Sequence, residues 1–244
     1  MKHTLIMMVF VLANNLMAKS IEHTNQFNMT DNLNKQEKHI VTIAATTAIG
    51  NIDGLKTALH SGLDAKLSIN QINEVLTQMY AYAGFPRSLT GINIFMAIVD
   101  ERKSKGIIDE VGKMPSAINE GIDKYERGRK VLEELTKQPQ SKPAKGFGEF
   151  NPAIDRFLKE HLFADIFDSD VLSYQQRELA TIAALASMPG VEPMLQSHLN
   201  MGMNVGLTQI QLNDLFIIIE NKISKKQADG GRVVLAKVLA SRKQ

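Results

Sequence analysis

The sequence contains one helical pattern twice, and this duplication limits the possible fold more than any other feature. The tetrapeptide TIAA occurs at residues 42–45 and again at residues 181–184, an offset of 139. Further along, Gly62 recurs as Gly202, at an offset of 140. Because the order is kept with a single inserted residue, we interpret the chain as a tandem duplication whose halves fold alike.

Each copy is predicted to be α-helical, because apolar residues recur at helical spacing behind helix-starting signals. Ser68, Ser173 and Thr208 are each followed three residues later by a glutamine and then by an apolar run, the pattern of a capping box. No segment reads as a convincing strand, so the predicted fold class is all-α. Helix ends are expected at Gly50, at Gly84 with Pro86, and at Pro189 with Gly190.

Further helices are expected outside the repeated pattern. They cover residues 86–103, residues 118–135, and the segment from the Asn151 cap to Leu162. The prolines, glycines and charges of residues 137–149 predict an exposed connector. The expected organisation is a signal peptide at 1–18, a linker at 19–32, a first copy at 33–103, a connector at 104–150 and a second copy at 151–244.

The first residues predict a secretory signal peptide. Lys2 and His3 give a basic start, the apolar run 5–12 follows, and small residues come next. The run is too short to span a bilayer, which needs about 20 apolar residues. Cleavage after Ala13 and cleavage after Ala18 both fit; an uncleaved anchor or a core helix is the alternative. We therefore expect a periplasmic or secreted protein that is not membrane-bound after cleavage.

Composition excludes several kinds of chemistry. The 28 Lys and Arg against 26 Asp and Glu leave a net charge of +2, so there is no basic excess for nucleic acid. The absence of cysteine removes disulfides, thiol nucleophiles and dithiol redox chemistry. No two of the six histidines have the spacing of a helical metal site, and no glycine-rich phosphate loop occurs. We therefore expect no metal and no other cofactor.

One acid–imidazole pair is expected in the second copy. Glu178 lies 11 residues before Pro189, and His198 lies 9 residues after it. In two antiparallel helices joined at that turn, with a rise of about 1.5 Å per residue, both side chains lie at similar height. A carboxylate orients an imidazole and favours its protonated form, so His198 is the candidate catalytic acid and Glu178 its partner. A purely structural contact is the alternative. The first copy has His39 and Ala58 at these positions.

Three further residues are candidates for binding an anionic substrate. Arg177 directly precedes Glu178, while Tyr82 and Arg87 lie near the predicted helix end of the first copy. Guanidinium groups hold carboxylates through two hydrogen bonds, and a phenol adds a hydrogen-bonding hydroxyl. The alternative for the tyrosine is packing with its hydroxyl satisfied.

These residues resemble the carboxymuconolactone decarboxylase family. The resemblance covers about residues 35–103 and 152–240, and therefore both copies. It implies a duplicated helical bundle of the alkylhydroperoxidase D-like fold, whose members assemble into rings, so a homo-oligomer is expected. The motifs that carry it are 74–86 (EVLTQMYAYAGFP), 177–186 (RELATIAALA), 197–199 (SHL) and 206–208 (GLT).

The decarboxylase branch of the family implies a specific chemistry. A small carboxylated lactone loses carbon dioxide, and the carbon left behind takes up a proton without any cofactor. In this reading His198 is the acid, Glu178 orients it, and Arg177 or Arg87 binds the substrate carboxylate. The expected partner is thus a small lactone or organic acid.

Two other classes of function stay open. One is a non-catalytic helical oligomer that binds a small ligand. The other is a peroxidase role, which the family's redox branch performs with a Cys-x-x-Cys motif ending four residues before a histidine. Val191 and Met194 occupy those two positions before His198, so this chemistry lacks its thiols.

Overall fold

Helices make up all the regular structure of residues 32–117 and 121–243, which are the residues that the computed structural model describes. No strand occurs in these residues, and the all-α class is confirmed. The helices belong to one compact unit that begins at Asn34. The predicted signal peptide lies outside the described residues, as does the predicted linker up to residue 31.

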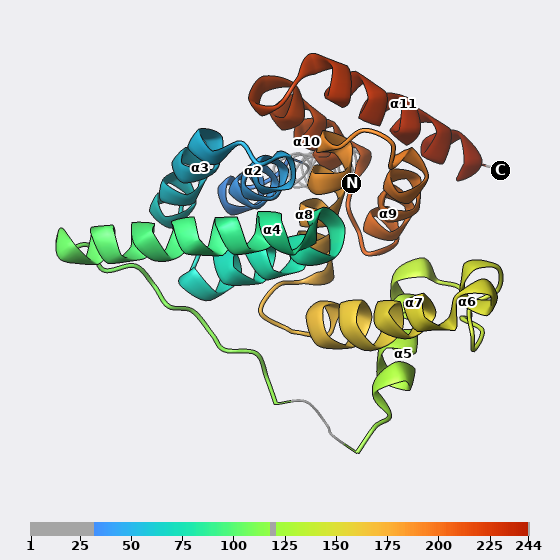
Figure 1. Ribbon diagram of the computed structural model, residues 1–244. Helices are drawn as coiled ribbons and strands as arrows, with labels where there is room; N and C mark the ends of the chain where they lie inside the picture. Colours follow the sequence, from blue (N-terminus) through green and yellow to red (C-terminus); the bar gives the residue numbers. More distant parts are fainter. Residues whose placement is uncertain (1–31, 118–120, 244) are drawn as a thin grey trace, which may run out of the picture. The chain divides into compact units, whose positions relative to one another are not determined.

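The first copy follows the predicted helix signals. Its helices are α2 (Lys35–Ile49), α3 (Ile52–Asp64) and α4 (Ile69–Ser104) (Figure 1). Helix α2 ends at Gly50, whose φ of 68° lies in the left-handed region that suits glycine. The Ser68 capping box starts α4. Non-helical backbone at Gly84, with φ 83° and ψ 159°, kinks α4 just before Pro86, so two predicted helices are joined into one element.

The second copy repeats this order. Its helices are α8 (Tyr174–Ser187), α9 (Glu192–Asn204) and α10 (Gln209–Lys222), and α11 (Lys225–Ser241) follows. The predicted capping boxes at Ser173 and Thr208 start α8 and α10. Gly190, with φ 81°, lies in the turn that reverses the chain between α8 and α9. This turn places Glu178 and His198 on neighbouring helices.

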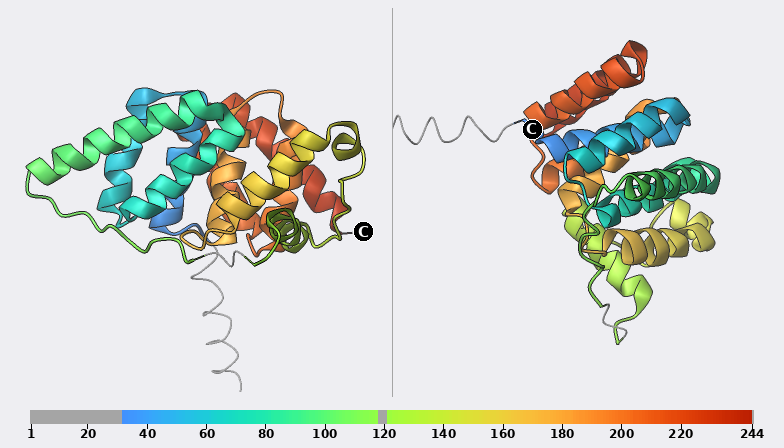
Figure 2. Two further views of the ribbon diagram at one scale, coloured as in Figure 1. Left: turned by 60° about the horizontal axis from the view of Figure 1, so that its bottom comes forward. Right: turned by 90° about the vertical axis from the view of Figure 1, so that its left-hand side faces the viewer.

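The two copies interlock through equivalent helices. Helix α2 packs against α8, while α4 packs against α8 and α10 packs against α2. The third helix of each copy therefore contacts helices of both copies. Figure 2 shows the blue and green helices of the first copy beside the orange and red helices of the second. Small side chains let helix backbones approach closely. Fully buried alanines of α2 and α8 include Ala44, Ala45, Ala180, Ala183 and Ala184.

The predicted connector and the first residues of the predicted second copy together form a helical module. It contains α5 (Lys124–Thr136), α6 (Phe147–Phe150), α7 (Pro152–Arg156) and the π-helix η1 (Phe157–Phe167). The predicted helix 118–135 thus begins later, at Lys124, and the helix predicted to end at Leu162 continues to Phe167. Residue 118 lies outside the described residues.

Helix α5 packs tightly on η1, so the region predicted as a connector contains part of the hydrophobic core. A Cβ atom on Gly128 would lie 1.8 Å from the backbone oxygen of Lys159, which only glycine permits. Val131 and Leu135 of α5 are buried, together with Phe163 and Phe167 of η1. Ile122, which precedes α5, is 40% exposed.

Candidate functional site

A cavity of about 640 Å³ lies where the second copy meets the α5–η1 module. Tyr82 of α4, Leu132 of α5, Leu162 of η1, and Met201 and His198 of α9 are among its lining residues. Its size falls within the range of about 300–1,000 Å³ usual for small-molecule sites. Most of its lining side chains are apolar, so the few polar groups at its wall decide its chemistry.

The structure brings Glu178 and His198 together at this wall. The Nδ1 atom of His198 lies 2.8 Å from Oε2 of Glu178, and both side chains are buried. A carboxylate only accepts hydrogen bonds, so Nδ1 carries the proton of this contact. The other ring nitrogen, Nε2, is not engaged by this carboxylate. The proximity predicted from the spacing is confirmed.

Tyr82 extends this pair from the other copy of the repeat. Its hydroxyl oxygen lies 3.5 Å from Nε2 of His198, and the two rings meet edge to face. Burial raises the pKa of Tyr82, and the carboxylate of Glu178 raises it further. The phenol therefore keeps its proton and is a hydrogen-bond donor at the cavity.

Glu178 has an unusual environment for a carboxylate. Its side chain is fully buried, and its Oε1 atom has no hydrogen-bond partner within the described part of the chain. His198 is thus the group that satisfies this carboxylate. Such an arrangement holds the imidazole in one orientation, since a ring flip would leave a buried charge unpaired.

The structure does not bring the two candidate arginines to the cavity. Arg177 is fully buried, and its Nη2 atom donates to Oε2 of Glu74 at 2.7 Å and to the backbone oxygen of Ser169. Burial lowers the pKa of Arg177, and the nearby Glu74 opposes this shift. The Arg87 guanidinium lies against Gly50 at the C-terminal end of α2 and is not among the residues that line the cavity. The predicted carboxylate clamp is therefore not assembled here.

Sequence reasoning missed the wall that the connector region supplies. Leu132 and Thr136 of α5 line the cavity, as do Gln140 and Ala144 of the following segment and Phe147 of α6. The helical periodicity of α5 was visible in the sequence, but its contact with the second copy depends on tertiary packing. Because of these residues, the cavity at the second copy is bounded by more than the helix pair α8 and α9.

Other kinds of site were searched within residues 32–117 and 121–243. In this range, no three His, Asp or Glu side chains are grouped so that they would hold a metal ion. Each helix of the same range falls short of the length or apolar character that crossing a membrane requires.

Comparison with known protein families identifies the family of the chain. No curated protein matches the chain. The sequence profile of the Carboxymuconolactone decarboxylase family matches residues 16–96 and 152–220, which together are more than half of the chain. The two matched segments cover most of the helices of the two copies, which is consistent with a tandem form. The family has the alkylhydroperoxidase D-like helical fold. The chain is thus a tandem member of the carboxymuconolactone decarboxylase family.

Proposed function

We propose that this protein is a cofactor-free acid–base enzyme that acts on a small carboxylated lactone or organic acid. The observation that supports this most is the Glu178–His198–Tyr82 chain at the wall of the 640 Å³ cavity. It combines a proton-transfer group, a carboxylate that orients it and a neutral hydrogen-bond donor. Family membership adds the reaction type.

The proposed reaction needs one proton and no other reagent. The bond between the substrate carbon and its carboxylate breaks, and its electron pair delocalises into the conjugated lactone. Carbon dioxide leaves, and Nε2 of protonated His198 delivers a proton to the carbon. Tyr82 donates a hydrogen bond to the oxygen on which negative charge develops. Apolar walls favour this step, because they solvate a carboxylate poorly and an uncharged product well.

The test measures carbon dioxide release and lactone consumption by the purified protein over a panel of small carboxylated lactones. Replacing the general acid in His198→Ala should lower the rate on the order of 10²–10⁴-fold. The control is His60→Ala, which changes a histidine of the equivalent helix α3 and should leave the rate unchanged. Equal rates for wild type and His198→Ala would refute the proposal.

A second candidate function is ligand binding without turnover. It is favoured by one observation: no Lys or Arg is among the described residues that line the cavity, so nothing but His198 attracts a substrate carboxylate. If the panel shows binding by calorimetry but no carbon dioxide release, this second function replaces the first. A thiol peroxidase is not proposed, because the chain has no cysteine.

We also propose that the protein is exported and self-associates. The basic and apolar start of the chain supports export, and the family resemblance supports assembly into a homo-oligomer. Intact-mass measurement after expression in a secreting host should show loss of residues 1–13 or 1–18. An unprocessed protein would contradict the proposed export. Analytical ultracentrifugation should give a mass that is a multiple of the mass of the processed chain, and a monomer would contradict the proposed self-association.

A further inference from the structure

One wall of the cavity comes from a segment that the family profile does not match. Residues 97–151 lie between the two matched ranges. Within them, α5 supplies Leu132 and Thr136, the following segment supplies Gln140 and Ala144, and α6 supplies Phe147. We call residues 132–147 the covering segment. The acid–imidazole pair comes from the family's helices, whereas the opposite wall comes from this addition.

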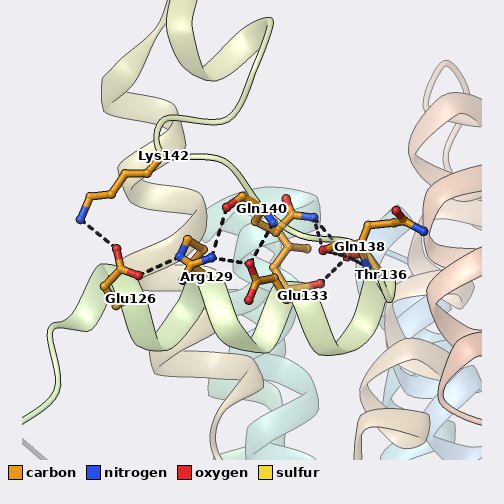
Figure 3. Close-up of polar contacts among 8 residues, drawn as sticks. Glu126, Arg129, Glu133, Thr136, Gln138, Gln140 and Lys142 are labelled. Atoms are coloured by element: carbon orange, nitrogen blue, oxygen red, sulfur yellow. Dashed lines mark hydrogen bonds and ion pairs between the residues drawn. The ribbon is translucent and has the colours of Figure 1, made fainter.

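A polar network holds the covering segment to α5, as Figure 3 shows. The backbone nitrogen of Gln140 donates to Oε1 of Glu133 at 2.9 Å. Arg129 donates to the backbone oxygen of Gln140 at 3.2 Å and also pairs with Glu133. The Gln140 side chain donates to the Thr136 hydroxyl at 3.1 Å. Gln140 is thus held at its backbone nitrogen, its backbone oxygen and its side chain.

Further contacts hold the remainder of the segment. Lys142 donates to Glu126 of α5 at 2.9 Å. The backbone nitrogen of Ala144 donates to Asp155 at 3.3 Å, and the buried hydroxyl of Tyr125 donates to the same carboxylate at 2.6 Å. Lys159, fully buried, completes an ion pair with Asp155. The covering segment is therefore fixed in place by hydrogen bonds and ion pairs.

The charges at the cavity limit what fits inside. None of the described lining residues is Lys, Arg, Asp or Glu, and the ionisable ones are Tyr82 and His198. Tyr82 stays neutral, so His198 is the one side chain among these lining residues that can pair with a carboxylate as a cation. A ligand with two carboxylates would therefore leave at least one charge unpaired among apolar side chains, which costs binding energy.

We propose that the covering segment determines specificity and selects, as substrate, a monocarboxylate with an extended apolar body. A neutral lactone has no carboxylate to lose, and it binds in the same cavity as a ligand only. The polar end of the ligand lies at His198, and its apolar body lies against Leu132, Ala144 and Phe147. The inference rests on the proposed function for the site, but its binding part does not require turnover.

The chain has no tryptophan, so one introduced tryptophan reports on the covering segment alone. In Phe147→Trp the indole replaces a side chain that lines the cavity and is 52% exposed. The matched control is Phe150→Trp, on the same helix α6. Phe150 is 93% exposed and does not line the cavity. The probes are octanoate, γ-decalactone and the dicarboxylate adipate.

Octanoate and γ-decalactone should shift the emission of Phe147→Trp to the blue and leave that of Phe150→Trp unchanged. The dissociation constant for adipate should be at least about 10-fold higher than that for octanoate, since its second charge stays unpaired. Tighter binding of adipate, or equal emission changes in both variants, would overturn the inference.

A second pair of variants tests the role of the covering segment by removing the contacts that hold it to α5. Arg129→Met removes the contacts to Glu133 and to Gln140, and should weaken octanoate binding about 5–10-fold while the far-ultraviolet circular dichroism stays unchanged. The control Arg232→Met removes ion pairs with Glu220 and Asp229 on the C-terminal helices and should bind octanoate like wild type; the side chain of Arg232 is 33% exposed. Equal affinities of all three proteins would contradict the role of the covering segment.

The two proposals fail in different ways. If the probes bind as expected but His198→Ala does not alter any turnover, the proposed catalysis fails and the specificity inference stands. If lactones are turned over but dicarboxylic ones are preferred, the specificity inference fails and the catalysis stands.

Discussion

The two copies of the repeat hold equivalent hollows with different walls. In the first copy a hollow of about 380 Å³ lies between α2 and α3, where the second copy has its 640 Å³ cavity between α8 and α9. At five of the six equivalent lining positions, the larger cavity has a bulky or imidazole side chain and the smaller hollow has a small or polar one. These pairs are Leu185 and Thr46, Met194 and Gly54, His198 and Ala58, Met201 and Ser61, and Tyr82 and Lys222. The sixth pair, Ser197 and Thr57, has a small hydroxyl side chain in both.

This difference shows that duplication preserved the helical frame but not the chemistry. His39 takes the place of Glu178, and Ala58 takes the place of His198, so the first copy has no acid–imidazole pair. Burial lowers the pKa of His39, and Lys35 and Lys222 lower it further, while Asp64 raises it. The covering segment lines only the second copy's cavity among the described residues.

The two copies also differ in an ion pair that occupies equivalent positions. Arg177 of α8 pairs with Glu74 of α4 at 2.7 Å, and the equivalent Lys38 of α2 approaches Asp214 of α10 at 4.0 Å. The side chain of Arg177 is 0% exposed, whereas that of Lys38 is 49% exposed. Both pairs join one copy to the other, and only the first is buried enough to matter for stability.

The largest effect is expected from removing the carboxylate that distinguishes the second copy. Glu178→Gln keeps the shape but loses the charge that orients His198, so the turnover proposed above should fall roughly 10²–10⁴-fold. His39→Gln, at the equivalent position, should leave it unchanged. Initial rates across pH 5–9 test this, because a positioning role also changes the pH profile. Equal losses in both variants would mean that the copies share the site.

Next in size is the effect of breaking the buried ion pair. Arg177→Met leaves Glu74 partly buried without its partner and should lower the free energy of unfolding by about 3 kcal/mol. Lys38→Met should change it by less than about 1 kcal/mol, because that pair is half exposed. Urea unfolding followed by circular dichroism measures both. Similar losses would show that exposure does not set the difference between the pairs.

A smaller difference is expected between the equivalent glycines of α3 and α9. Alanine at either position gains roughly 0.5–1 kcal/mol from reduced freedom of the unfolded chain. A Cβ on Gly202 would lie 3.0 Å from Ile182 and from Leu207, whereas on Gly62 its nearest contact is 3.2 Å. Gly62→Ala should therefore be more stable than Gly202→Ala by about 0.5–1 kcal/mol in thermal unfolding. The reverse order would contradict this account of the packing.

The smallest effect concerns pH. Because the pKa of His39 is lowered in the folded protein from its ordinary value of 6.5, the unfolded chain binds the proton first as the pH falls. Stability should thus decrease as the pH drops below about 6.5. In urea unfolding at pH 7.5 and 5.5, His39→Gln should lose less stability than wild type. An identical loss would show that His39 does not contribute.

Much of the frame was predictable because its signals are local. A capping box at Ser68 or Ser173 satisfies backbone groups within three residues, so it acts wherever the helix lies. The proximity of Glu178 and His198 also followed from local geometry, since a single turn at Gly190 joins their helices. Arg177 was misplaced because its guanidinium pairs with Glu74, which is 103 residues away and belongs to the other copy.

The sequence by itself determined the all-helical class, the duplication and the family, and it placed one carboxylate and one imidazole at similar height on neighbouring helices; their contact was decided by the structure. The tertiary structure alone decided that α5 and residues 137–147 close the cavity and that both arginines face away from it. The physical reason is range: helix signals act over three to five residues, whereas a cavity wall depends on which distant apolar faces pack together.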